Sequence, residues 1–270
     1  MTLLVVGASG FLGAEVCRQA VAAGTRVVGT YHSAGVAVPG VEPRRLDVTD
    51  RAAVRALLTQ VRPDAVVATP YRYDDWAVTA DGAANIAVAA AEVGARLVHL
   101  SSDALHGGRP TPYLDDDVPS PIHAYGAAKA AAETAVRAID PGAVLVRTSL
   151  ILGEGSKQIQ LCLEALAGRA TLFTDEARCP VDVTDLAAAV LELVPSDHAG
   201  PLNVAGPDPV SRAEMGILVA RQFGLDPAGL KTTTTVAAGL HRPTDVRLDS
   251  SRAAGLLRTR LRGVTELLAP

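Results

Sequence analysis

Short apolar runs alternate with helical stretches along the first half of the chain. Runs rich in Val, Leu and Ala occupy residues 3–6, 26–30, 65–68, 96–100 and 143–147, and short runs of this kind between turn residues are typical of buried strands. Helical patterns fill most of the intervals, at about 11–23, 50–61, 75–93 and 123–138. Strands alternating with helices at this spacing predict βαβ units. The pattern therefore predicts an α/β fold with a parallel sheet.

The alternation becomes less regular after about residue 150. Thr184 and Asp185 are expected to cap a helix that runs to residue 194, and residues 202–204 look strand-like. Ser211 and Glu214 have the spacing of a capping box, which predicts a helix to residue 223. From residue 231 we expect irregular chain with short helices. These features favour a main domain over residues 1–150, rejoined by residues 180–205, with residues 151–178 and 206–270 in a small subdomain.

Composition and charge narrow the class of protein. The 270 residues are 49% hydrophobic and 20% charged, which suits one large domain carrying a small subdomain. A net charge of −4 without runs of like charge argues against nucleic acid or a membrane surface as partner. The N-terminal apolar run lacks a basic region and breaks at Gly7, unlike a signal peptide. We therefore expect a cytoplasmic protein without membrane spans.

The cysteines and histidines give no sign of a disulfide framework or a metal site. Cys17, Cys162 and Cys179 lie far apart and form no C-x-x-C pair, and the six histidines lack the spacing of metal ligands. Three buried free thiols in a reducing compartment are the simplest interpretation. No metal is expected. A homodimer is the base-rate expectation for the oligomeric state.

A glycine-rich turn follows the first predicted strand and opens the first helix. Gly7, Gly10 and Gly13 have the spacing G-x-x-G-x-x-G. In this context the glycines allow a tight turn and bring the backbone close to a pyrophosphate, which binds the free N–H groups of the helix N-terminus. The sequence thus predicts a Rossmann-type, doubly wound sheet that binds NAD(P). The residues expected to contact the cofactor here are Gly7, Ser9, Gly10, Phe11, Leu12 and Gly13.

The end of the second predicted strand bears on the choice between NADP and NAD. An acidic residue there would bind the ribose hydroxyls of NAD and repel a phosphate. Instead, Thr30, His32 and Ser33 offer a neutral tip with several donors. The absence of an acidic residue favours NADPH over NADH, although the sequence excludes neither cofactor. Asp47 and Val48 are expected beside the adenine, although they also suit a helix-capping segment.

A tyrosine and a lysine lie four residues apart on a predicted helix. This spacing puts Tyr125 and Lys129 on one helix face. A phenol can protonate a carbonyl oxygen, and a nearby ammonium would lower its pKa of about 10 toward neutral pH. Lys129 can also hold the nicotinamide ribose. Only three of the 25 basic residues are lysines. A lysine at this position of an arginine-rich chain therefore indicates that the site requires a compact point charge.

The third candidate group stands where the fourth predicted strand ends. The carboxyl edge of a parallel sheet faces the cofactor, and Ser101 and Ser102 follow that strand directly. Ser102 is expected to hydrogen-bond the substrate carbonyl, with Ser101 as the alternative. Serines at strand ends also occur for turn formation alone. With Tyr125 and Lys129, Ser102 completes a predicted catalytic group for reduction of a ketone.

These residues resemble the extended short-chain dehydrogenase/reductase family, and within it the dTDP-4-dehydrorhamnose reductases. The likeness includes the glycine turn and the Ser101-Ser102-Asp103 segment, where those reductases have Ser-Thr-Asp. It includes Tyr125 with Lys129, and Arg242-Pro243 followed by Leu248-Asp249. Ala68, Thr69 and Pro70 stand where the family commonly has Asn-Ala-Ala, which implies that Ala68 and Thr69 contact the cofactor.

The resemblance implies a reductase acting on a nucleotide-linked 4-keto-6-deoxysugar or another biosynthetic ketone bound by the small subdomain. Arg178 and Arg242 are then expected at the diphosphate of the substrate, or else in surface or interdomain ion pairs. His106 is expected to line the pocket, or to have no role. Two alternatives stay open: an epimerase or dehydratase that retains NAD, and a regulatory protein that binds NAD(P) without turnover. The sequence does not identify the ketone.

Overall fold

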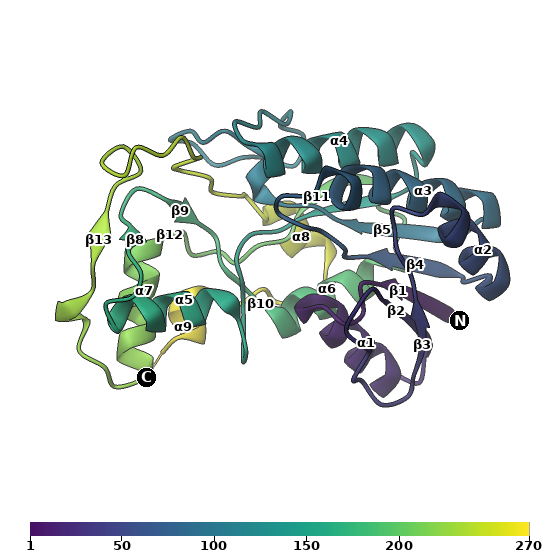
Figure 1. Cartoon of the computed structure of the whole chain (residues 1–270), viewed down its shortest axis with the longest axis horizontal. Coiled ribbons are helices and arrows are strands. Elements are labelled where there is room, and N and C mark those ends of the chain that lie inside the picture. The colour runs from purple at the N-terminus through teal and green to yellow at the C-terminus, as the bar shows by residue number, and fades with distance from the viewer. Residues whose placement is uncertain (270) are drawn as a thin grey trace.

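The core of the computed structural model, which describes residues 1–269, is a seven-stranded parallel sheet (Figure 1). Its order is β11-β6-β5-β4-β1-β2-β3. The strands are β1 (Thr2–Val6), β2 (Arg26–Tyr31), β3 (Val41–Arg45), β4 (Ala65–Ala68), β5 (Arg96–Leu100), β6 (Val144–Arg147) and β11 (Gly200–Asn203). The order reverses direction at β1, so the doubly wound α/β fold class is confirmed.

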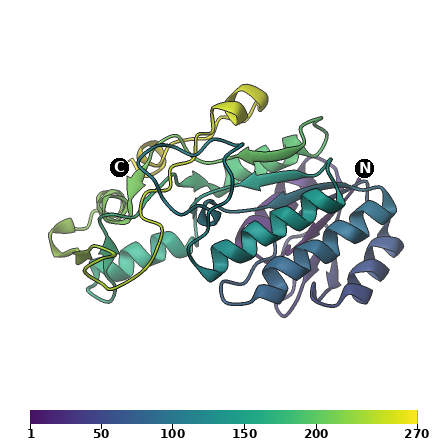
Figure 2. The same ribbon diagram turned by 90° about the horizontal axis from the view of Figure 1, so that it is seen from above.

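Helices cover both faces of the sheet. One face carries α1 (Phe11–Ala22) and α6 (Val183–Leu193); the other carries α2 (Arg51–Val61), α3 (Gly82–Val93) and α4 (Ala124–Ile139). Figures 1 and 2 show the α2–α3–α4 layer on one side of the strands. Each layer packs aliphatic side chains onto the inner strands, whose central residues are buried. Strands buried on both faces explain why the sequence shows continuous apolar runs.

A smaller lobe stands beyond the carboxyl ends of the strands (left in Figure 1). Its core lies between α5 (Lys157–Leu166), α7 (Arg212–Gln222) and α9 (Val264–Leu267), and is separate from both sheet layers. Three short strand pairs lie outside the main sheet: β7 (Ile151–Leu152) with β10 (Val181–Asp182), β8 (Leu172–Phe173) with β13 (Thr232–Thr233), and β9 (Ala177–Arg178) with β12 (Val210–Ser211). The helix α8 (Ser251–Leu256) returns to β11.

The expected capping box and the expected free, buried cysteines are both present. The capping box of Ser211 and Glu214 is formed, and α2 is capped by Asp50, which accepts a hydrogen bond from Ala53 N. The three cysteines are free and buried. Within residues 1–269, no helix is long and apolar enough to cross a membrane, and no cluster of potential metal ligands is found.

Two boundaries differ from the expectation. The helix expected over residues 75–93 starts with a π-helical turn, Ala77–Asp81, before α3 begins at Gly82. The helix expected from Thr184 is capped two residues earlier, by Asp182, whose carboxylate accepts hydrogen bonds from the N–H groups of Thr184 and Asp185. A carboxylate in this position satisfies two free donors and fits the positive end of the helix dipole.

Candidate functional site

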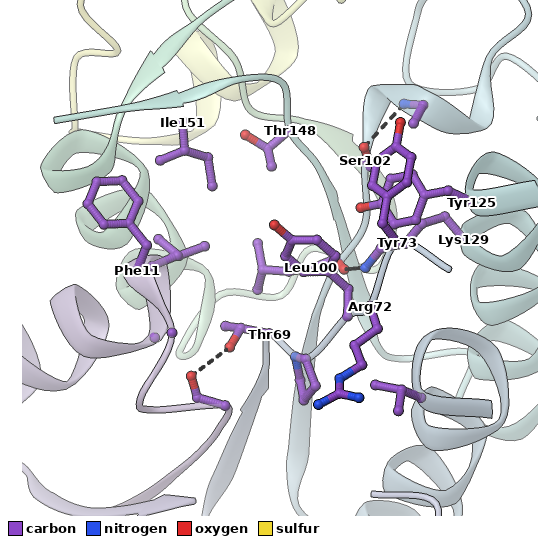
Figure 3. Close-up of a pocket in the computed structure, with 18 of the residues that line it drawn as sticks. Phe11, Thr69, Arg72, Tyr73, Leu100, Ser102, Tyr125, Lys129, Thr148 and Ile151 are labelled. Carbon is purple, nitrogen blue, oxygen red and sulfur yellow. Dashed lines mark hydrogen bonds between the residues drawn. The ribbon is translucent and has the colours of Figure 1, made fainter. Parts of the chain in front are cut away.

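A cleft of about 980 Å³ runs along the carboxyl edge of the sheet, where the two lobes meet. The ends of β1, β2, β4, β5 and β6 form one wall, and Lys157, Gln158, Arg212 and Arg242 of the smaller lobe lie opposite. In Figure 3, Ser102, Tyr125 and Lys129 lie together on one side, across from Phe11 and Ile151. A site at the strand-order reversal is where open α/β sheets bind ligands.

The glycine turn is closed so tightly that no side chain fits at Gly7 or Gly13. A Cβ atom on Gly13 would lie 2.2 Å from the carbonyl oxygen of Gly7, and one on Gly7 would lie 2.5 Å from the Thr69 hydroxyl. Gly7 also has a φ of +86°, which glycine adopts without strain. The helix α1 then starts after Gly10, which offers no side chain to cap it. The result is an N-terminus whose backbone donors face the cleft.

The end of β2 supports this turn and reaches the far end of the cleft. Buried Thr30 accepts a hydrogen bond from Gly7 N at 3.2 Å. His32 Nε2 lies 3.7 Å from Asp47 Oδ2, and both side chains are about half exposed. Hydrogen bonds from Thr49 hold the pKa of Asp47 below its usual range, and His32 contributes in the same direction. The Asp47 carboxylate therefore lies beside the end of β2, where the sequence itself has no acidic residue.

Ser102 lies at the loop after β5 and is oriented by its neighbours. Its hydroxyl accepts from Ala104 N and donates to Asp103 Oδ1, both at 3.2 Å. Asp103 is itself buried and accepts a hydrogen bond from the Ser149 hydroxyl at 2.7 Å. Ser101 also lines the cleft, and its buried hydroxyl has no partner among the described residues. Asp103 is therefore the group that fixes the Ser102 hydroxyl.

The helix α4 docks directly on this serine loop. A Cβ atom on Gly126 would lie 2.1 Å from the Ala104 carbonyl oxygen, so only glycine permits this approach. His123 caps the helix by accepting a hydrogen bond from Gly126 N at 3.0 Å. The close contact brings Tyr125, the residue before Gly126, to the serine loop. Ser102, Tyr125 and Lys129 all line the cleft.

Lys129 is almost fully buried and holds the backbone of β5. Its Nζ donates to the Leu100 carbonyl at 2.8 Å, and the side chain is 2% exposed. Burial lowers the pKa of Lys129 to about 8, while Glu133 acts in the opposite direction. Glu133 is paired with buried Arg147 at 2.8 Å. The ammonium is therefore easier to deprotonate than that of an ordinary lysine.

The pKa of Tyr125 corrects the sequence-based expectation. Burial raises the pKa of this phenol, the Tyr71 ring and the Asp103 carboxylate add to the increase, and hydrogen bonding with Ser102 opposes it. The expected lowering by Lys129 is not found. Burial is the main cause, and two aromatic rings contribute to it: Tyr73 stacks on Tyr125 with ring centroids 4.4 Å apart, and the Tyr71 ring lies at 5.8 Å.

Three arginines gather at the end of the cleft formed by the smaller lobe. Arg242 Nε lies 2.9 Å from Glu176 Oε1, and Arg212 Nε lies 3.5 Å from the other oxygen of this fully buried carboxylate. Arg178 is held more firmly, by the carbonyl oxygens of Pro243 and Thr244 and by Asp103 at 3.7 Å. Three guanidinium groups thus share two carboxylates, which leaves net positive charge at this end.

The structure does not bring every predicted residue into the cleft. Ser33 and Ala68 are absent from its wall, and His106 is completely buried beneath it, stacked on Tyr113 at 3.9 Å. The expectation that His106 lines the pocket is therefore not supported by its position. Burial lowers the pKa of His106 to about 3.

The wall also contains residues that the sequence analysis did not select: Tyr71, Arg72, Tyr73, His123, Thr148, Lys157, Gln158 and Arg212. Lys157, Gln158 and Arg212 belong to the smaller lobe, so their approach to the cleft depends on how the two lobes meet. The sequence signal that could have identified some of these residues lies in the segment 71–76. Three aromatic residues occur there within six positions, in a chain with only 3% aromatic residues.

The fold and site define a Rossmann-type protein with a dinucleotide-sized cleft and a Ser–Tyr–Lys group. Over residues 1–269 the chain matches the family described as RmlD substrate binding domain. It belongs to that family.

Curated relatives of this chain carry different names. The chain is 31% identical over 287 residues to dTDP-4-dehydrorhamnose reductase of Mycolicibacterium smegmatis, covering 98% of this chain and 83% of the relative. It is 27% identical over 299 residues to methionine adenosyltransferase 2 subunit beta of Rattus norvegicus, covering 99% and 87%. A crystal structure of dTDP-4-dehydrorhamnose reductase from Bacillus anthracis str. Ames in complex with NADP is similar in fold, with a TM-score of 0.84. That similarity covers 99% of this chain and 96% of the other, at 22% identity.

Proposed function

We propose that this protein is an NADPH-dependent reductase of a keto group on a nucleotide-linked sugar, of the 4-keto-6-deoxy kind. The observation that carries the proposal is the convergence of Ser102, Tyr125 and Lys129 on one cleft with the glycine turn. The relatives named dTDP-4-dehydrorhamnose reductase support the substrate class.

The cleft has the features that a dinucleotide requires. The closely packed Gly7 and Gly13 leave room for a pyrophosphate at the N-terminus of α1, where Ser9 to Leu12 also line the cleft. Thr30, His32, Asp47 and Val48 would surround the adenosine, and Thr69 and Lys129 would lie toward the nicotinamide end. The bound dinucleotide would supply the hydride for carbonyl reduction.

The proton would come from Tyr125. A raised pKa keeps this phenol protonated at neutral pH, which is the form that a proton donor needs. Ser102 would donate a hydrogen bond to the same carbonyl oxygen, with Asp103 fixing the direction of its hydroxyl. Lys129 would stabilise negative charge that develops on the phenol, because a charge in a buried site acts through a low dielectric.

The arginine end of the cleft would hold the diphosphate of the substrate. Arg242 is the best placed of the three, since its side chain is 36% exposed. Arg212 lies beside it on Glu176, and Arg178 is already occupied by backbone carbonyls. We therefore assign direct phosphate contact to Arg242 and Arg212, and a supporting position to Arg178. Guanidinium groups suit this role through bidentate hydrogen bonding.

The choice of cofactor depends on two opposing features. The tip of β2 carries no acidic residue, which favours NADPH. Asp47 nevertheless places a carboxylate next to His32, and its charge would disfavour a 2′-phosphate. Titration of the purified protein with NADPH and with NADH measures which feature dominates.

The test combines a substrate panel with one variant. NADPH oxidation is followed with nucleotide-linked 4-ketosugars and with simpler ketones, for the wild type and Tyr125→Phe. The proposal predicts turnover with at least one ketone, and a loss of at least a hundredfold in Tyr125→Phe while NADPH affinity is kept. Tyr113→Phe, outside the cleft, is the matched control and should retain activity. Full activity in Tyr125→Phe would contradict the proposed mechanism.

A second candidate is a regulatory protein that binds NAD(P) without turnover. Relatives named methionine adenosyltransferase 2 subunit beta favour it, as does the aromatic cover over Tyr125. Binding of NADPH without oxidation by any ketone, and no effect of Tyr125→Phe, would support this function. Copurification of tightly held NAD, without net redox turnover, would instead support an epimerase or dehydratase.

A further inference from the structure

Two tyrosines between β4 and the following π-helical turn enclose the proposed proton donor. We call residues 69–76 the tyrosine loop. The Tyr73 ring lies nearly parallel to that of Tyr125, with centroids 4.4 Å apart and an interplanar angle of 15° (Figure 3). Tyr71 contacts the same ring at a tilt of 54° and also lies 5.6 Å from Lys129 Nζ. The phenol is therefore covered by its neighbours on two sides.

The cover is thin, because the tyrosines themselves remain at the surface. Tyr71 is 55% exposed and Tyr73 is 60% exposed. The loop is anchored behind them: the buried Thr79 hydroxyl donates to the Arg72 carbonyl at 2.8 Å, and Arg72 N donates back to this hydroxyl at 2.9 Å. Tyr73 lies beyond this anchor, and its contacts with Tyr125 and His123 are ring against ring. Such contacts can be exchanged for contacts with another ring.

A ketone must come within hydrogen-bonding distance of the Tyr125 hydroxyl to receive its proton. The stacked Tyr73 ring occupies one face of that phenol. We propose that Tyr73 is a specificity-determining residue whose ring covers Tyr125 and is displaced by the sugar ring of the substrate. The identity of the substrate in this inference rests on the proposed function. The stacking of Tyr73 on Tyr125 is independent of that function.

Competition between the Tyr73 ring and the sugar of the substrate for the face of Tyr125 predicts a change in the affinity for nucleotide sugars. A nucleoside diphosphate alone fills the arginine end and leaves the Tyr73–Tyr125 stack intact, whereas a nucleotide sugar must break it. Stacked aromatic pairs are worth a factor of roughly two to ten in an equilibrium constant. Tyr73→Ala should therefore bind dTDP-glucose about two- to tenfold more tightly than the wild type does, and dTDP with unchanged affinity.

Calorimetric titration with dTDP-glucose and dTDP tests this prediction in three variants. Tyr73→Phe keeps the ring and should behave as the wild type. Trp76→Ala removes an exposed aromatic residue from the same loop that does not line the cleft, and should also leave both affinities unchanged. Weaker binding of dTDP-glucose to Tyr73→Ala would show that Tyr73 is a fixed wall of the sugar site. That result, or equal binding to both proteins, would overturn the proposal.

A measurement without ligand keeps the cover separate from the proposed function. Nitration by tetranitromethane, mapped by mass spectrometry, should spare Tyr125 in the wild type and in Trp76→Ala, and modify it in Tyr73→Ala. Nitration of Tyr125 at equal rates in all three proteins would refute the cover. If neither nucleotide binds the wild type, the proposed substrate class is wrong, and the nitration pattern still decides whether Tyr73 shields Tyr125.

Discussion

Lys129 offers a direct test of the burial that shapes this site. An exposed lysine has a pKa of about 10.5, whereas burial lowers the pKa of Lys129 to about 8. Between these values the unfolded chain binds a proton that the folded protein has lost, so stability rises with pH. Below pH 8 both states are protonated, and the folded protein bears the full cost of the buried ammonium. The difference between the two pKa values corresponds to about 3 kcal/mol.

The perturbation is Lys129→Met, which keeps the length of the side chain and removes its charge. The lost hydrogen bond to the Leu100 carbonyl lowers stability at every pH. The pH-dependent contribution of Lys129 should appear in the difference between the free energies of unfolding of the wild type and the variant. This difference should shift in favour of the wild type by about 3 kcal/mol from pH 7 to pH 10.5, most steeply above pH 8.

Urea unfolding of both proteins without cofactor, at several pH values, measures this difference. Titration of other groups affects both proteins equally and cancels, provided that the slopes with denaturant agree. The exposed Lys231 supplies the control, since Lys231→Met should show no comparable rise. A flat difference for Lys129→Met would mean that this lysine is solvated in the native protein. The lowering of the pKa of Lys129 by burial would then be refuted.

Three further substitutions examine other parts of the cleft. Gly13→Ala places a methyl group 2.2 Å from a backbone carbonyl oxygen and should lower stability by about 1–3 kcal/mol and weaken NADPH binding. Thermal unfolding and cofactor titration check this, with Gly255→Ala as a control in open space. Asp47→Asn should raise affinity for NADPH relative to NADH severalfold by removing a carboxylate beside the adenosine end, as fluorescence titration would show. Glu133→Gln should cost about 3–5 kcal/mol in urea unfolding, because it leaves the buried Arg147 without a counter-charge.

The sheet was predictable because its strands are buried on both faces and therefore read as apolar runs. The edge strand β3 shows the limit of this signal. Its sequence, Val41–Arg45, contains a proline and two arginines, and its residues are exposed or only partly buried. Proline is tolerated at a sheet edge, where one side of the strand makes no ladder hydrogen bonds. An edge strand need not be apolar, so periodicity alone does not reveal it.

The glycine turn and the candidate catalytic residues could be placed at the cleft from the sequence because each depends on local spacing. The rest of the cleft depends on long-range packing. Arg212 is the first residue of a helix whose capping box is evident in the sequence, yet nothing local indicates that its guanidinium meets Glu176 and faces the cleft. His106 shows the opposite error, since a polar residue in a predicted loop is buried against Tyr113.

The pKa shifts of Tyr125 and Lys129 have the same cause. The raised pKa of Tyr125 is opposite to the shift expected if the Lys129 ammonium activated the phenol. Burial favours the neutral form of both groups, so it raises the pKa of the phenol and lowers that of the amine. A neutral tyrosine is ready to donate a proton, and a pKa of about 8 leaves Lys129 largely charged at neutral pH, so that it can stabilise the phenolate that remains. Above pH 8 this charge is lost, unless polar groups beside Lys129 raise its pKa; hydroxyl groups of a bound ribose would have the required chemistry. Cofactor binding and proton donation are then coupled through the charge of one lysine.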